Sequence, residues 1–270
     1  MKKLIYVVLV LLLLVSVSVF GAWAPIAQAE TELRYADAPI VSTLASTQIY
    51  YTSRVIDEGE TAGGAPLYNY SAGYANACGP IAGTAIVAFY DKYYPELIPD
   101  WESYYPATGK YRLQVTTYTT PVLSELYTLM QTNVKGDGVS ESEFKTGLQT
   151  YITNRGYSVS YTNVKSGSSL NYSACKAAID SNKVIALFIK PGIVYDIWEY
   201  SDHDTFVENT IAGNHIMYAY GYFQLKYYDS TGLFRTETFL EVSVGQPATT
   251  FAYYKVDSSN LEAAYVVNVG

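Results

Sequence analysis

Hydrophobic residues recur with a helical period in the middle of the chain. The period predicts a helix over Ile81–Tyr94, which follows Cys78-Gly79-Pro80 and is stopped by Pro95. Proline at a first helical position and acidic residues in a first turn predict two further helices, which begin at Thr120 and near Val139. The central part of the chain is therefore expected to be largely helical.

Alternating polar and apolar positions, which are typical of strands, dominate the later part of the chain. We expect strands over Tyr157–Val164, Val184–Ile189, His215–Tyr222, Phe223–Tyr228, Thr236–Val244 and Thr250–Val256. A short helix is expected over Ser173–Ser181, and Asp229–Gly232 is a turn between two strands. Because helices come first and antiparallel strands come after them, the pattern predicts an α+β fold.

The N-terminus has the features of a secretory signal. Lys2 and Lys3 precede the apolar run Leu4–Phe20, and Ala27-Gln28-Ala29 fits the small-x-small cleavage pattern. We expect a signal peptide over residues 1–29, cleaved after Ala29, and a protein secreted from a bacterium. Retention of the apolar run as a membrane anchor is the alternative.

The stretch after the leader is mixed in composition and rich in turn residues. Residues 30–66 end in Glu58-Gly59-Glu60-Thr61-Ala62-Gly63-Gly64-Ala65-Pro66, which favours a flexible joint. We expect residues 30–66 to be an N-terminal arm or a short pro-like segment, and residues 67–270 to be the functional domain.

Composition narrows the classes of partner and cofactor. A formal net charge of −8 opposes nucleic acid and anionic lipid as main partners. Two cysteines are too few for a disulfide framework and, with two histidines, for a dense zinc site. The 29 tyrosines are typical of half-buried strands in an extracellular domain. We expect a monomer that needs no metal or organic cofactor.

Cys78 is the first candidate for chemistry, because it stands at the start of the helix predicted from Ile81. Free N–H groups at a helix N-terminus favour a thiolate over a thiol. Gly79 and Gly83 are expected to leave room for a substrate backbone near the sulfur. The alternative is a small buried core residue, since free cysteines are often buried.

His215 is the second candidate, at the start of a strand and after the glycine turn Gly213-Asn214. A histidine in that place can lean into a cleft, although a hydrogen-bonded histidine at a strand end is the alternative. Nucleophilic cysteines are found with histidines that lie far away in the sequence, as Cys78 and His215 do. His203 lies in an acidic stretch that we interpret as an exposed loop, which makes it the poorer candidate.

The segments around these two residues resemble a known family. Ala77-Cys78-Gly79-Pro80-Ile81-Ala82-Gly83-Thr84 and Gly213-Asn214-His215-Ile216-Met217-Tyr218-Ala219-Tyr220-Gly221-Tyr222 resemble the signature segments of papain-like cysteine peptidases of the bacterial C39-like and staphopain/streptopain-like branches. The resemblance covers about residues 68–250. It implies an N-terminal helical half carrying Cys78, packed on a C-terminal antiparallel sheet carrying His215.

The same resemblance implies the roles of the site residues. Cys78 is the nucleophile and His215 its base, in a thiolate–imidazolium pair that forms an acyl-enzyme with a peptide or isopeptide substrate. The family's oxyanion glutamine is absent before Cys78, and Asn76 is preferred over Asn69 as the replacement. The residue that orients the histidine falls at about Ser243.

Several alternatives stay open at this point. Glu241 and Asp229 compete with Ser243 as the group that orients the histidine. Cys175 is interpreted as a core residue, but a bridge between Cys78 and Cys175 would remove the nucleophile. The leading hypothesis is an exported cysteine peptidase. The others are a catalytically inactive domain that binds partners through its tyrosine-rich surface, and a thiol acyltransferase.

Overall fold

A computed structural model describes residues 32–61, 65–68, 73–101, 110–112, 117–246 and 251–270. From Leu33 onward, these residues belong to a single structural unit. The predicted signal peptide, residues 1–29, lies outside the described residues, so its cleavage after Ala29 stays a prediction. None of the helices in the described ranges is long and apolar enough to cross a membrane.

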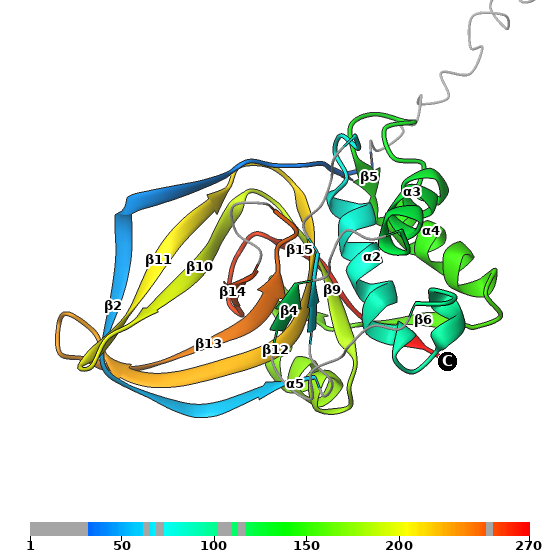
Figure 1. The fold of residues 1–270 in the computed structure, drawn as a ribbon. Helices are drawn as coiled ribbons and strands as arrows, with labels where there is room; N and C mark the ends of the chain where they lie inside the picture. Colours follow the sequence, from blue (N-terminus) through cyan, green and yellow to red (C-terminus); the bar gives the residue numbers. More distant parts are fainter. Residues whose placement is uncertain (1–31, 62–64, 69–72, 102–109, 113–116, 247–250) are drawn as a thin grey trace, which may run out of the picture. The chain divides into compact units, whose positions relative to one another are not determined.

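Six antiparallel strands close a β-barrel, in the order β12, β13, β14, β10, β11, β2 and back to β12 (Figure 1). Their bounds are β2 (Ile40–Glu60), β10 (Gly192–Glu199), β11 (His203–Ile211), β12 (His215–Tyr228), β13 (Phe234–Ser243) and β14 (Phe251–Lys255). The ring closes because β12 pairs with β13 along one edge and with β2 along the other. A buried cluster of five aromatic residues and one leucine from these strands forms the barrel's own core: Tyr50, Tyr195, Phe206, Leu225, Tyr227 and Phe239.

The sheet continues beyond the barrel through three more strands. These are β9 (Val184–Ile189), β15 (Leu261–Val269) and β6 (Val159–Asn163), and β9 pairs with the first residues of β12. Every residue of β9 is buried, because alternate side chains enter two separate cores. Phe188 packs toward one core, and its neighbour Leu187 packs toward the other.

Helices cover both faces of this extension. The helices are α2 (Cys78–Asp91), α3 (Thr119–Leu129), α4 (Glu141–Thr153) and α5 (Tyr172–Asp180). The first three share one hydrophobic core with Phe188 and Ile216, whereas α5 belongs to the core on the other face. The short remaining elements are β1 (Arg34–Tyr35), β3 (Ala65–Leu67), the 3-10 turn η1 (Pro95–Leu97), β4 (Lys110–Arg112), β5 (Val139–Ser140), β7 (Lys165–Ser166) and β8 (Ser169–Leu170).

Local signals placed the four helices correctly. The helix predicted near Val139 is α4, which begins with a reciprocal capping box between Ser140 and Glu143. Proline stands in the first turn of α3, as expected from Thr120 and Pro121. The predicted strand over Val184–Ile189 is confirmed as β9, and the turn after β12 lies where the sequence placed it.

The expected fold class is wrong. The structure is mostly β, with a closed six-stranded barrel, additional strands and only four helices among the described residues, and it is not a papain-like helical half packed on a sheet. The prediction missed four long strands: β2, β10, β11 and β15. One of them, β11, begins in the acidic, polar stretch 199–208, where an exposed loop was expected. Residues 30–66, for which an arm or pro-like segment was expected, contain the barrel strand β2.

Candidate functional site

The N-terminus of α2 directs its free N–H groups toward the sulfur of Cys78. Cys78 is the first residue of the helix, and Ala77 before it provides no side-chain cap. Backbone N–H groups of Ile216, Gly79 and Cys78 itself favour the thiolate. Burial nevertheless dominates and raises the pKa of the Cys78 thiol to about 12. The sulfur therefore carries its proton in this structure.

The glycines after Cys78 serve packing rather than access. A Cβ atom on Gly79 would lie 2.6 Å from Cγ2 of Val139 and 3.4 Å from Cδ1 of Ile216. On Gly83 it would lie 2.9 Å from Cε of Met130. These distances leave no open space at either glycine, so both let α2 approach its neighbours closely.

His215 is fully buried at the first residue of β12. Its Nε2 lies 2.7 Å from the carbonyl oxygen of Val244, to which it donates as Nε2–H. Its Nδ1 is buried and has no hydrogen-bond partner among the described residues. Burial lowers the pKa of the imidazole, while the Val244 carbonyl, the charge of Asp37 and the backbone of Ala36 oppose that shift. Burial therefore favours the neutral ring, in which Nε2 carries the proton.

The two candidates are neighbours across the contact between α2 and β12. The Cys78 sulfur lies at the N–H of Ile216, the residue that directly follows His215. The charge of Asp37 raises the pKa of both groups. Because both groups are buried, desolvation opposes the charged forms that the expected ion pair requires.

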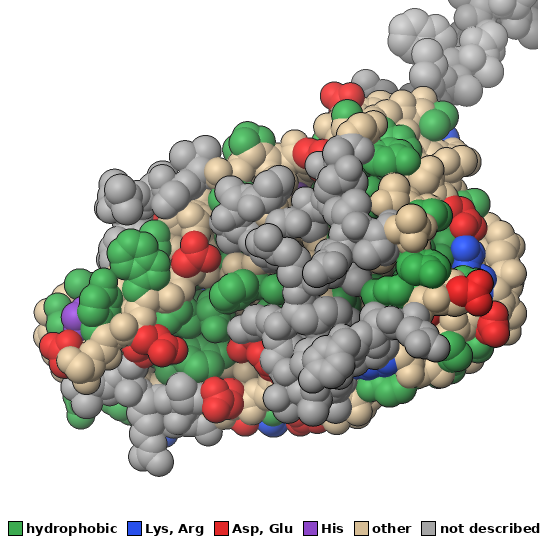
Figure 2. Space-filling model, in the orientation of Figure 1, with side chains coloured by type: hydrophobic (Ala, Val, Ile, Leu, Met, Phe, Trp, Pro, Cys, Tyr) green, Lys and Arg blue, Asp and Glu red, His purple; other side chains and the backbone are tan. Residues whose placement is uncertain are grey.

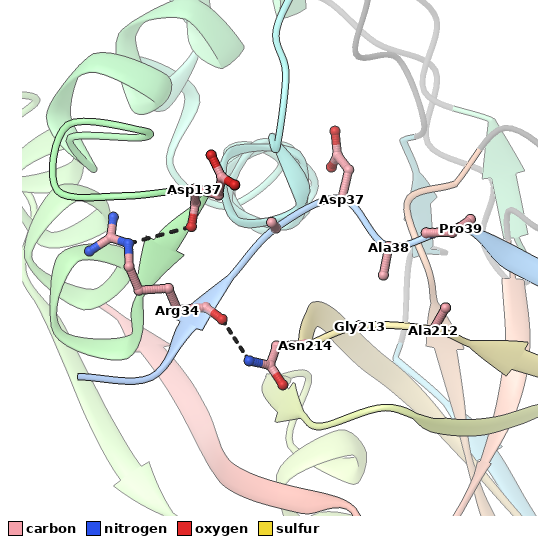
Figure 3. Close-up of a pocket in the computed structure, with 9 residues that line it drawn as sticks. Arg34, Asp37, Ala38, Pro39, Asp137, Ala212, Gly213 and Asn214 are labelled. Atoms are coloured by element: carbon pink, nitrogen blue, oxygen red, sulfur yellow. Dashed lines mark hydrogen bonds between the residues drawn. The ribbon is translucent and has the colours of Figure 1, made fainter. Parts of the chain in front are cut away.

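A pocket of about 390 Å³ lies next to this pair (Figure 3). Its lining is Arg34, Ala36, Asp37, Ala38, Pro39, Asp137, Ala212, Gly213 and Asn214. In Figure 3 the Asn214 side chain points toward the Arg34 carbonyl, whereas the Asp37 side chain points away from Asn214. Neither Cys78 nor His215 lines the pocket, so access to them is blocked in this structure.

Asn76 and Ser243, the other predicted site residues, make different contacts. Asn76 has a positive φ of 56°, and its Nδ2 donates to Oδ1 of Asn133 at 3.0 Å. One of the two N–H donors of its amide is therefore engaged by Asn133. Ser243 is buried and pairs with Tyr218 in the β12–β13 ladder. Asn69 lies outside the described residues.

The group that orients His215 is a backbone carbonyl. Val244, which follows Ser243, accepts the Nε2–H hydrogen bond. Of the two competing carboxylates, Asp229 is ion-paired with Arg235, and Glu241 lies opposite Gly221 in the β12–β13 ladder. No sequence signal identifies such a carbonyl, because every residue carries one.

Cys175 and His203 behave as the poorer candidates. Cys175 is a free, fully buried thiol in α5, and Cys78 is free as well, so the proposed bridge between them is absent. They belong to cores on opposite faces of the sheet. His203 begins β11 rather than lying in a loop, stacks on Tyr200 at 4.7 Å and contacts Oδ1 of Asp202 at 2.7 Å.

A scan against protein-family models and searches of curated proteins and of solved structures found no match to this chain. The functional argument therefore depends on the residues of the site alone.

Proposed function

We propose that the protein is a cysteine hydrolase that cleaves peptide bonds, with Cys78 as nucleophile and His215 as its base. The observation that carries the proposal is the placement of the fully buried His215 directly before Ile216, whose backbone N–H favours the Cys78 thiolate. A basic ring nitrogen in this position and a thiol at an uncapped helix N-terminus suit proton transfer.

The chemistry can begin from the neutral pair. Nδ1 of His215 takes the Cys78 proton as the sulfur attacks the substrate carbonyl carbon. The Val244 carbonyl then stabilises the imidazolium through Nε2–H. Backbone N–H groups at the start of α2 face the developing oxyanion, and His215 returns the proton to the leaving amine. Water resolves the acyl-enzyme and regenerates the thiol.

The chain contains its own control for a test of the nucleophile. We expect Cys78→Ala to reduce hydrolysis of fluorescently labelled casein at least 100-fold, because the acyl-enzyme cannot form. Cys175→Ala replaces an equally buried thiol in the other core and is expected to retain hydrolysis within a few-fold. Both variants are checked by circular dichroism. Equal hydrolysis by wild type and Cys78→Ala would reject the mechanism.

One surface favours a second candidate, a binding module. Aromatic side chains follow each other across paired strands at one end of the barrel, where His203 pairs with Tyr51, Tyr51 with Tyr228, and Tyr228 with Phe234. Tyr51, Tyr228 and Phe234 are 38%, 48% and 55% exposed. Figure 2 shows hydrophobic side chains gathered at that end of the molecule. Aromatic rings on a surface are typical of recognition sites. Binding is favoured over catalysis if wild type and Cys78→Ala behave alike with casein.

A further inference from the structure

Residues 36–39, which we call the strap, line the pocket, and Ala36 and Asp37 among them act on the candidate pair. The strap connects β1 to β2 and continues the antiparallel pairing of β2 with β11 beyond the formal ends of those strands. Ala212 N–H donates to the Pro39 carbonyl at 3.2 Å, and Ala36 N–H donates to the Asn214 carbonyl at 3.3 Å. The strap is therefore bound as an extended strand along residues 212–214.

Side chains complete the binding of the strap backbone. Nε2 of Gln246 donates to the Ala38 carbonyl at 3.0 Å from the segment that follows Val244. Nδ2 of Asn214 donates to the Arg34 carbonyl at 2.8 Å, just before the strap. The groove formed by residues 212–214 and Gln246 thus binds the peptide backbone. These hydrogen bonds do not depend on the side chains of the bound segment.

The strap also supplies part of the environment of the two buried groups. The backbone of Ala36 faces His215, and the charge of Asp37 acts on both His215 and Cys78. Cys78 and His215 are 2% and 0% exposed. An extended segment with its backbone bound in this groove therefore lies where a peptide substrate has to lie.

An ion pair holds the N-terminal end of the strap. Nη2 of Arg34 lies 3.0 Å from Oε2 of Glu143 and donates to the Gly138 carbonyl at 2.8 Å. Glu143 is fixed in turn by its capping hydrogen bond from Ser140 N–H at 2.9 Å. Tyr35 is 1% exposed and packs edge-on against Phe188. The strap can open only when this anchor loosens.

We propose that the groove of residues 212–214 and Gln246 is the site for an extended peptide substrate, and that the strap is its internal occupant. This inference rests on the proposed function. A substrate peptide would take over the hydrogen bonds of the strap by adding a strand to the 212–214 edge, a common mode of peptide binding. Displacement of the strap would also remove the burial that keeps the Cys78 thiol protonated.

The test measures how fast iodoacetamide alkylates Cys78 in the full chain at pH 8, with Cys175 as the reference thiol in the same molecule. Arg34→Ala is expected to speed alkylation of Cys78 about tenfold, because it removes a charge-assisted hydrogen bond from the anchor. Gln246→Ala is expected to act in the same direction and changes only one half-buried side chain. Arg155→Ala is the matched control, since it removes the ion pair with Glu125 away from the strap.

Peptide binding provides the second readout. The synthetic peptide Arg-Tyr-Ala-Asp-Ala-Pro, which copies residues 34–39, should bind the double variant R34A/C78A more tightly than C78A, as measured by calorimetry. Faster alkylation and tighter peptide binding without any casein hydrolysis would support the groove and reject the proposed function. If Arg34→Ala and Gln246→Ala both leave the alkylation rate of Cys78 unchanged, the proposal that the strap occupies the substrate groove is overturned.

Discussion

The two cysteines occupy helices on opposite faces of the same sheet, and their surroundings differ more than their burial does. Burial raises the pKa of each thiol to about 12. Cys175 is enclosed by apolar side chains such as Ile185 and Leu187. Cys78 instead has the N–H of Ile216 at its sulfur and the Asp37 charge nearby. Burial and pKa alone therefore do not distinguish a site from a core; the neighbouring groups do.

The starts of the two helices show the same difference. In α5 the Asn171 side chain accepts the N–H of Ala174 at 3.1 Å, which satisfies an orphan donor of the first turn. In α2 no side chain caps the helix, and the N–H groups face a sulfur. An α-helix that leaves its N-terminal donors to a titratable group gives up cap stabilisation of about 1 kcal/mol. We interpret this as the cost of a helix terminus used for chemistry.

The largest expected effect is the loss of casein hydrolysis when His215 is replaced. His215→Ala should lower casein hydrolysis about 1000-fold, within the usual range for loss of a general acid–base. His203→Ala removes the chain's other histidine, which stacks on Tyr200 at the barrel end, and should leave hydrolysis within a few-fold. Both variants are measured at matched folded fractions. If they lose casein hydrolysis equally, the region around α2 is not distinguished from the rest of the molecule as the active site.

A smaller effect is expected in the pH dependence of stability. Burial lowers the folded-state pKa of His215, so below its unfolded value, about 6.5, the unfolded chain binds a proton that the folded chain does not. The free energy of unfolding therefore falls as pH drops, by up to about 1.4 kcal/mol per pH unit from this one group, and the effect vanishes at higher pH.

Urea unfolding of wild type and His215→Gln between pH 7.5 and 5 measures this slope. The variant should lose part of the dependence below pH 6.5, whereas Cys175→Ala should keep it. Parallel curves for wild type and His215→Gln would mean that the imidazole titrates alike in both states, against its burial in this structure.

Whether a structural feature can be predicted from the sequence depends on whether it is formed by residues close together in the chain. The helix start at Ser140 and Glu143 and the buried strand at Val184–Ile189 depend on residues close in sequence, and both were predicted. The barrel depends on β2 pairing with β11 and β12, which lie far along the chain, so no local period reveals it. The prediction of an α+β fold failed for that reason.

The candidate site also combines features that local sequence predicts with features that it does not. Cys78 and His215 stood out because their local segments combine a helix start, a strand start and reactive side chains. The Val244 carbonyl and the strap contacts at Asp37 arise only from tertiary packing. An ordinary carbonyl and an exposed aspartate carry no sequence signal for such roles.

The central claim is that the buried His215 is neutral, carries its proton on Nε2 and serves Cys78 as its base. Nitrogen-15 NMR of the imidazole in the intact chain at pH 7 tests it most directly, because the two ring-nitrogen shifts identify the tautomer. The account predicts a neutral ring protonated at Nε2, with an Nδ1 shift that changes in Cys78→Ala and not in Cys175→Ala. A ring protonated at Nδ1, or an Nδ1 shift indifferent to Cys78, would contradict it.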